Sequence, residues 1–241
     1  MRRRYLCGAF VGVLAIAAAL SASAGGAAPG LRHAGIHRIS NSTSSNWSGY
    51  AVTGSKFTSV SASWTEPTVT CSKTAYSSFW VGLDGDTSNT VEQTGTDADC
   101  SGSTPQYYAW YEMYPKYPVN LRGRVRPGDH LSASVTTNGT GAFTLTITDS
   151  TQGWTNSTNA RLKSAKLASA EVIAEAPSSN SGVLPLANFG TVSFTGASAN
   201  GALLTSSTPN IDPITMASGS TVKAQPGSIN NGAFSVAWKH S

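Results

Sequence analysis

The chain is poor in charged residues and has almost no excess of either sign. Its 241 residues include 16 Lys and Arg and 12 Asp and Glu, and charged residues make up 12% of the total. Three of the basic residues, Arg2, Arg3 and Arg4, stand together at the N-terminus, which leaves 13 basic against 12 acidic residues in the rest of the chain. No basic stripe remains, and this excludes the usual signature of a nucleic-acid partner.

Long apolar runs are also missing, with one exception at the N-terminus. Leu6–Leu20 is apolar, follows the three arginines, and precedes the small-residue cleavage site Ala22-Ser23-Ala24. This order predicts a secretory signal peptide over residues 1–24, and a transmembrane anchor is the alternative. The run is too short to span a bilayer comfortably. We therefore expect a secreted, extracellular protein with no membrane partner after signal removal.

Cysteine and histidine are too scarce for most metal sites. Cys7 lies in the signal peptide, so only Cys71 and Cys100 remain. In an exported protein such a pair predicts a disulfide, with two free thiols as the alternative. The histidines, which lie far from any zinc-ligand spacing, are His33, His37, His130 and His240. We expect no metal and no cofactor.

The motifs of the common hydrolases are absent as well. There is no G-x-S-x-G, and Ser101 and Ser103 lie in a Gly/Ser/Thr-rich loop. His130 follows a Pro-Gly-Asp turn, which is typical of a surface residue, while His33 and His37 fall in the N-terminal segment. A Ser-His-Asp triad is poorly supported, and the chain contains no glycine-rich phosphate loop.

What the sequence does contain is strand alternation from Asn46 onward. In 131–136 and 143–148, for example, apolar residues alternate with Ser or Thr, and turn pairs such as Asn138-Gly139 separate runs at intervals of about 8–12 residues. This pattern predicts an all-β antiparallel sandwich or barrel. A helix-like piece begins near Ala160, but we expect strand from about Leu167.

The domain organisation is expected to be simple, because no repeat or linker divides the chain. Residues 25–44 lack apolar periodicity and are predicted to be a flexible leader or a short propeptide. Residues 45–241 are then one domain, and the length of the mature chain suits one large all-β unit. We expect a monomer.

Three apolar strand segments each contain a polar side chain that is hard to bury. They are residues 79–95, 107–115 and 169–177, and the polar residues are Gln93, Glu112 and Glu171. Burying an unpaired amide or carboxylate costs roughly 1–3 kcal/mol. Three of them therefore suggest a site, although each alone could be a solvent-facing or hydrogen-bonded residue.

The two-residue repeat of a strand predicts what surrounds these side chains. Gln93 shares a face with Val91 and Gly95, whereas Glu92 points away. The faces predicted around the two glutamates consist of Tyr108, Trp110, Glu112 and Tyr114, and of Glu171, Ile173 and Glu175. The aromatic row could equally be a platform on which sugars stack.

These segments resemble the glutamic peptidases, the eqolisin or G1 family. The matching pieces occur in the family's order and are NWSGYAV (46–52), FWVGLDGD (79–86), QTG (93–95), AWYEMYP (109–115) and SAEVIAEAP (169–177). The resemblance implies a two-sheet antiparallel β-sandwich, of concanavalin or jelly-roll type, that hydrolyses proteins at acid pH without a cofactor. It assigns Gln93 and Glu171 as the catalytic dyad. Residues that it places in substrate binding or support are Trp47, Asp84, Trp110 and Glu112.

The implied dyad is chemically sound. Ionised Glu171 can take a proton from water and later return it to the leaving amine. The amide of Gln93 can hold the oxyanion and orient the water. Activity should therefore fall on the acid side near the pKa of Glu171, about 4 if unshifted and higher if carboxylates are near.

Two other functions are compatible with the residues. A non-catalytic carbohydrate-binding module would use the row of Tyr108, Trp110 and Tyr114, and a glycosidase would use Glu112 and Glu171 as acid and base. The chain also departs from the family pattern, since Glu92 precedes the QTG motif where an aliphatic residue is usual.

Overall fold

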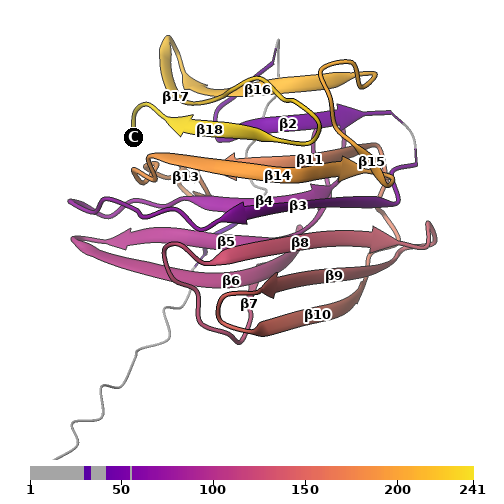
Figure 1. Ribbon diagram of the computed structural model, residues 1–241, viewed down its shortest axis with the longest axis horizontal. Coiled ribbons are helices and arrows are strands. Elements are labelled where there is room, and N and C mark those ends of the chain that lie inside the picture. Colours follow the sequence, from indigo (N-terminus) through magenta and orange to yellow (C-terminus); the bar gives the residue numbers. More distant parts are fainter. Residues whose placement is uncertain (1–29, 34–41, 55) are drawn as a thin grey trace, which may run out of the picture.

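The computed structural model describes residues 30–33, 42–54 and 56–241, and in these ranges it contains strands but no helix (Figure 1). The predicted signal peptide lies outside the described residues, as do Cys7 and His37. The strands in chain order are β1 (Thr43–Ser44), β2 (Trp47–Thr53), β3 (Ser59–Thr65), β4 (Ser78–Leu83), β5 (Val91–Ser101), β6 (Thr104–Tyr114), β7 (Val119–Asn120), β8 (His130–Thr137), β9 (Ala142–Asp149), β10 (Trp154–Arg161), β11 (Ser169–Glu175), β12 (Ser178–Ser179), β13 (Gly182–Val183), β14 (Thr191–Ala199), β15 (Ala202–Leu203), β16 (Ile211–Ser218), β17 (Thr221–Pro226) and β18 (Phe234–Trp238).

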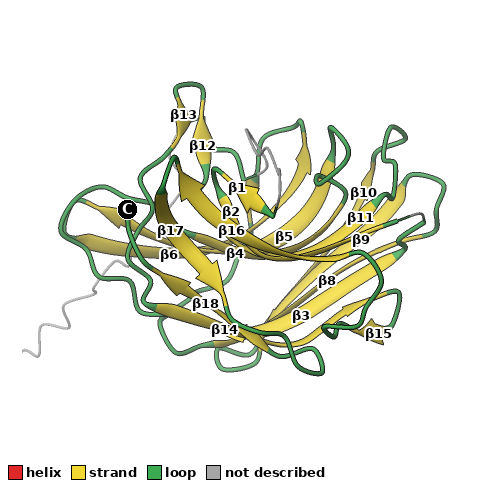
Figure 2. Cartoon of the chain, turned by 90° about the horizontal axis from the view of Figure 1, so that it is seen from above, coloured by secondary structure: helices red, strands yellow, loops and turns green. Residues whose placement is uncertain are grey.

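The strands form two facing layers, which are seen edge-on in Figure 2. The first sheet has the order β2-β11-β4-β5-β6-β7, and the second has the order β10-β9-β8-β3-β14-β18-β17. β16 joins them, because Ile211–Ile214 pairs with β2 whereas Met216–Ser218 pairs with β17. The predicted antiparallel two-sheet β-sandwich is confirmed.

The main core lies between the layers and follows from the alternation in the sequence. In β9, Phe143, Leu145 and Ile147 are buried, while the intervening threonines are partly exposed on the outer face of the second sheet. Val81 of β4 and Val172 of β11 enter the same core from the first sheet. Removing this apolar surface from water is the main favourable term in the folding free energy.

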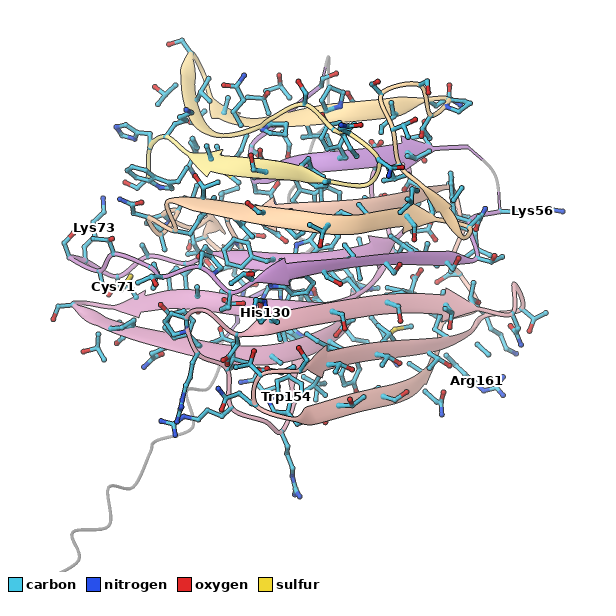
Figure 3. All side chains as sticks on the ribbon, in the orientation of Figure 1. Lys56, Cys71, Lys73, His130, Trp154 and Arg161 are labelled. Carbon is cyan, nitrogen blue, oxygen red and sulfur yellow. A yellow bond between two sulfur atoms is a disulfide. The ribbon has the colours of Figure 1, made fainter. Side chains whose placement is uncertain are left out.

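A disulfide fixes the loop before β4 to the end of β5. Cys71 and Cys100 are bonded across a separation of 29 residues, which confirms the predicted pair. In the chain-entropy model, closing a loop of this size stabilises the fold by about 3–4 kcal/mol. Figure 3 labels Cys71 in this region and His130 at the start of β8, where His130 is exposed as predicted.

The outer face of the first sheet differs from that of the second. Every residue of β4 and β11 is buried, and so is every residue of β5 except Ser101. A second apolar cluster lies on this outer face and includes Trp47, Trp80, Trp110 and Ile173. The polar residues singled out in the sequence lie on the same face.

Candidate active site

The strand register places the predicted dyad in one row across the first sheet. Glu171 of β11 is paired with Gly82 of β4, Gly82 with Gln93 of β5, and Gln93 with Glu112 of β6. Residues directly opposite each other in an antiparallel sheet project from the same face. Neighbouring strands are about 4.8 Å apart, so the backbones of Glu171 and Gln93 are about 10 Å apart with one strand between them.

Gly82 keeps the space between the two long side chains open. A Cβ atom at Gly82 would lie 2.9 Å from a ring carbon of Trp80 and 3.2 Å from the Cβ of Gln93. Any other residue would crowd the base of the Gln93 side chain. With no side chain at Gly82, the ends of Glu171 and Gln93 can approach each other above β4.

Two tryptophan rings form the next row along the sheet. The residues in register there are Ile173, Trp80, Gly95 and Trp110. Between these two rings only glycine fits at position 95. A Cβ atom on any other residue there would lie 2.2 Å from the carbonyl oxygen of Phe79 and would clash with it. Trp47 of β2 packs edge-on against Trp80, with ring centroids 4.9 Å apart. This apolar floor borders the row that holds the predicted dyad.

The indole nitrogens bind carboxylates in a third row. Trp80 Nε1 donates to Glu175 Oε2 at 2.7 Å, and Trp110 Nε1 donates to Asp97 Oδ1 at 2.6 Å. Asp97 Oδ2 also accepts from the hydroxyl of Tyr108 at 2.7 Å. These bonds fix both indoles and give Asp97 a defined orientation on the outer face.

The side chain of Glu112 orients the Gln93 amide. Gln93 Nε2 donates to Glu112 Oε2 at 2.8 Å, and the same oxygen accepts the backbone N–H of His33 at 3.1 Å. An amide NH₂ has two donors, so one remains for a further partner. Gln93 Oε1 has no partner among the residues that the structure describes. Burial raises the pKa of Glu112 to about 7, and His33 and Gln93 oppose that rise.

Glu171 is fully buried, and neither carboxyl oxygen has a well-formed hydrogen bond within the described part of the chain. Burial raises its pKa well above the usual value, and the nearby charges of Asp86, Asp84 and Glu92 raise it further, while Ser169 lowers it. A buried carboxyl and a buried amide oxygen without partners are costly in a purely structural role. They are suited to binding water or substrate.

Asp84 lies outside the row and supports it. It follows β4 with a φ of 68°, a left-handed conformation that aspartate tolerates better than most residues. Its carboxylate accepts backbone N–H bonds from Lys166, Leu167 and Ala168 at 2.7–2.8 Å. Asp84 therefore ties down the segment that leads into β11 and Glu171.

His33 and Asp97 belong to the site and were missed from the sequence. Continuing the alternation from Gln93 through Gly95 would have placed Asp97 on the same face. His33 lies in the segment predicted to be a flexible leader or a short propeptide, and no local pattern around His33 predicts a contact with Trp110. Within the described ranges, no group of three His, Cys, Asp or Glu side chains is arranged to hold a metal ion. The described part of the chain contains no helix, and hence no helix that could cross a membrane.

The fold and the site together define a β-sandwich with an amide and a carboxyl group in one row on its outer face. The chain belongs to the Peptidase A4 family, whose model matches residues 45–238. It is 29% identical over 181 residues to aspergillopepsin-2 of Aspergillus niger, covering 65% of this chain and 64% of that protein. It is 37% identical over 111 residues to scytalidopepsin B of Scytalidium lignicola, covering 45% and 42%.

The chain thus spans less than two thirds of the length of either of these relatives. Among solved structures, it is similar to scytalido-glutamic peptidase with a transition state analog inhibitor, with a TM-score of 0.72 and 27% identity. That match covers 81% of this chain and 98% of the solved chain. The resemblance to the glutamic peptidases is confirmed.

Proposed function

We propose that the protein is a secreted endopeptidase that hydrolyses protein substrates at acid pH, with Glu171 and Gln93 as its catalytic dyad. The observation that carries the proposal is the row in which these two side chains flank Gly82 on one face of the sheet. Membership of the Peptidase A4 family supports peptide-bond hydrolysis. The inhibitor complex of the solved relative supports a similar use of this fold.

In this mechanism the ionised carboxylate of Glu171 takes a proton from a water molecule as the water oxygen attacks the scissile carbonyl carbon. The carbonyl oxygen becomes an oxyanion, and the free N–H of the Gln93 amide stabilises it. Glu171 then gives the proton to the leaving amine as the C–N bond breaks. One carboxyl group serves as base and then as acid, and the amide keeps its charge state throughout.

The other residues of the site support the dyad. Glu112 holds one N–H of Gln93, so that the second N–H and the amide oxygen keep a fixed direction. Trp110 and Trp47 belong to the apolar floor beside the row, where a peptide side chain can pack. Asp84 supports Glu171 indirectly, because its carboxylate accepts the backbone N–H of Ala168 and so fixes the segment just before β11.

The test is hydrolysis of denatured casein or haemoglobin by Glu171→Gln and Gln93→Ala variants. Loss of one oxyanion donor typically lowers kcat by a factor of about 10²–10³. The kcat of Gln93→Ala should therefore fall by that factor, and the kcat of Glu171→Gln should fall by at least as much. Glu66→Gln is a matched control, because Glu66 is equally buried but binds Thr96 and Trp64 on the core side. Full activity in both dyad variants would refute the assignment.

The two other functions considered from the sequence have less support. The family to which the chain belongs is one of peptidases, which favours a peptide over a sugar as the ligand of the face that carries Tyr108 and Trp110. The backbones of Glu112 and Glu171 are three strand spacings apart, about 14 Å, and Glu112 is bonded to Gln93. Secretion and the monomeric state stay predictions from the sequence.

A further inference from the structure

The surface of the described ranges carries exposed cations but no exposed carboxylate. All 12 acidic residues lie in these ranges, and all are buried except Asp86 and Asp212, which are partly buried. Most lysine and arginine side chains there are exposed, and the only close pairs of a basic and an acidic side chain in these ranges involve His33. The near-equal charge counts of the sequence predicted no basic stripe, but burial removes one sign from the surface. The protein therefore presents positive charge to an approaching ligand.

Six of the exposed cations lie along one edge of the second sheet, beside or just after the edge strand β10. This basic band consists of Arg122, Arg124, Arg126, Arg161, Lys163 and Lys166. Side chains of β10 hold its first part in place. Trp154 Nε1 donates to the carbonyl oxygen of Arg124 at 2.8 Å, and Asn156 Nδ2 donates to that of Arg122 at 2.6 Å. Since β10 rises by about 3.3 Å per residue, the band follows this edge for about 23 Å.

Three carboxylates lie beside the basic band, and all three are buried. They belong to Asp84, Asp129 and Asp149. Each accepts backbone N–H groups, from residues 166–168, from Arg126, and from Thr151 and Gln152 respectively. Their charge lowers the positive potential of the band. They offer no carboxylate at the surface, however, that could occupy the arginines in place of a ligand.

A polar hollow of about 350 Å³ lies at the end of β10, beside Arg161. Figure 3 shows Arg161 at the opposite end of this strand from Trp154. Arg161 is paired with Ala142 of β9, and the small side chain of Ala142 leaves the space open. The polar side chains that line the hollow are Thr136, Thr137, Asn138, Thr144, Asn159 and Arg161. Its volume is in the range of small-molecule binding sites.

The hydrogen-bonding groups left free in the hollow match an acidic sugar. Thr144 Oγ1 donates to Asn159 Oδ1 at 2.9 Å, and Thr140 donates to Asn138 Oδ1 through its backbone N–H and its hydroxyl. The NH₂ group of each amide therefore remains as a donor, with no partner in the described ranges. Arg161 supplies the planar pair of N–H groups that binds a carboxylate with two hydrogen bonds. No acidic side chain lines the hollow. Donors for ring hydroxyls beside a guanidinium suit a uronic acid.

Other anionic partners match this edge less well. A membrane surface is bound through large apolar side chains as well as charge, and none of the exposed ones belongs to the band or the hollow. These are Tyr117, Val119, Leu203 and Val222. A single-stranded nucleic acid needs an aromatic ring on which bases can stack. The ring of Trp154 is covered by Gly123, where a Cβ atom would lie 2.7 Å from it. A chain of acidic sugars needs neither feature.

We propose that the hollow at Arg161 binds a uronic acid residue of an anionic polysaccharide, and that the basic band holds neighbouring residues of the same polymer. Thr144 and Asn159 lie on the outer face of the second sheet, whereas the proposed dyad lies on the outer face of the first. Sugar binding at this site is therefore independent of the proposed peptidase function. A protein held on such a polymer keeps its proposed catalytic face open to substrate.

The test is calorimetric titration of the full chain with trigalacturonate and with its methyl ester, at low salt and about pH 6, where a carboxyl group is ionised. Hydrogen bonds to a charged group are strong enough for the acid to bind about tenfold tighter than the ester, or more. Arg161→Ala should lose this preference. Asn159→Ala changes no charge and should weaken the binding of both. Equal affinities for acid and ester, or either variant binding as the unaltered protein does, would overturn the proposal.

The controls separate the hollow from diffuse charge and from the dyad. Lys73→Ala removes an exposed cation of the loop before β4 and should leave the affinity for trigalacturonate unchanged (Figure 3). Glu171→Gln should bind it as the unaltered protein does, and weaker binding would place the sugar at the catalytic row and overturn the hollow. Single-stranded DNA of matched charge should bind more weakly than polygalacturonate. Tighter binding of the DNA would assign the band to nucleic acid and overturn the proposal.

Discussion

At the scale of single residues, burial controls which carboxyl groups of the site are charged. In the proposed mechanism Glu171 must be ionised to accept a proton from water, yet burial holds the pKa of Glu171 well above the usual glutamate value of about 4.3. The charges of Asp86 and Asp84 add to the rise. The acid limb of activity should therefore lie at higher pH than an exposed glutamate would give.

The first prediction concerns Asp86→Asn. Removing this like charge stabilises ionised Glu171, so the pKa of Glu171 falls and the acid limb of kcat/KM moves to lower pH. The measurement is a profile of kcat/KM from about pH 3 to 8 for both proteins. Asp149→Asn is the control, because the buried Asp149 lies on β9 of the second sheet and does not figure among the charges that raise the pKa of Glu171. A limb that stays in place, or a flat profile, would contradict the assignment of Glu171 as the base.

At the scale of elements, the position of β11 depends on contacts with the loop after β4. The carboxylate of Asp84 accepts hydrogen bonds from the three backbone N–H groups of residues 166–168. The backbone N–H of Asp84 donates to the carbonyl oxygen of Ser169 at 3.0 Å. Ser169 is the first residue of β11. Two elements that are far apart in the sequence are thereby fixed to each other next to Glu171.

We predict that Asp84→Asn loosens this junction. Asparagine tolerates the same backbone conformation but offers one neutral acceptor oxygen, so charge-assisted bonds are lost and stability should fall by about 1–3 kcal/mol. Amide hydrogen exchange at residues 166–168 should become faster. Asp129→Asn, at another buried aspartate that accepts a backbone N–H, from Arg126, should lower stability without changing exchange there. Unchanged exchange in Asp84→Asn would contradict the anchoring role.

The elements were largely predictable from the sequence, whereas their register was not. Alternation predicted which side chains share a face within one strand, and Glu112 with Trp110, and Glu171 with Ile173, do so. The row that joins Glu171, Gly82 and Gln93 depends on pairing between strands that are far apart in the sequence. The approach of His33 to Trp110 depends on residues whose local pattern predicts no element, so local physics could not place it.

At the scale of the whole molecule, buried carboxyl groups are expected to set how stability depends on pH. Burial is the main cause that raises the pKa of Glu92 to about 9 and that of Glu66 to about 8. In the unfolded chain both should titrate near the usual value, about 4.3. Between that value and the raised ones, the folded state holds protons that the unfolded state has lost, so stability falls as pH rises.

We therefore predict that the protein is more stable at about pH 4 than at pH 8. Glu92→Gln should flatten the slope, because an amide does not titrate, and each kcal/mol regained at pH 8 should raise Tm by about 2–4 °C in a protein of this size. The measurement is the Tm of the unaltered protein and of Glu92→Gln at several pH values between about 4 and 8. Parallel Tm curves for the two proteins would show that Glu92 does not contribute.

The position of β11 between β2 and β4 also has a consequence for biosynthesis. Glu171 pairs with Ala51 on one side and with Gly82 on the other, and β2 in turn needs β16 as its outer neighbour. Contacts between such distant positions form late and slowly. Until residues 211–214 have been translated, β2 therefore has no outer neighbour, and the sheet that would carry the proposed dyad stays unfinished on the ribosome.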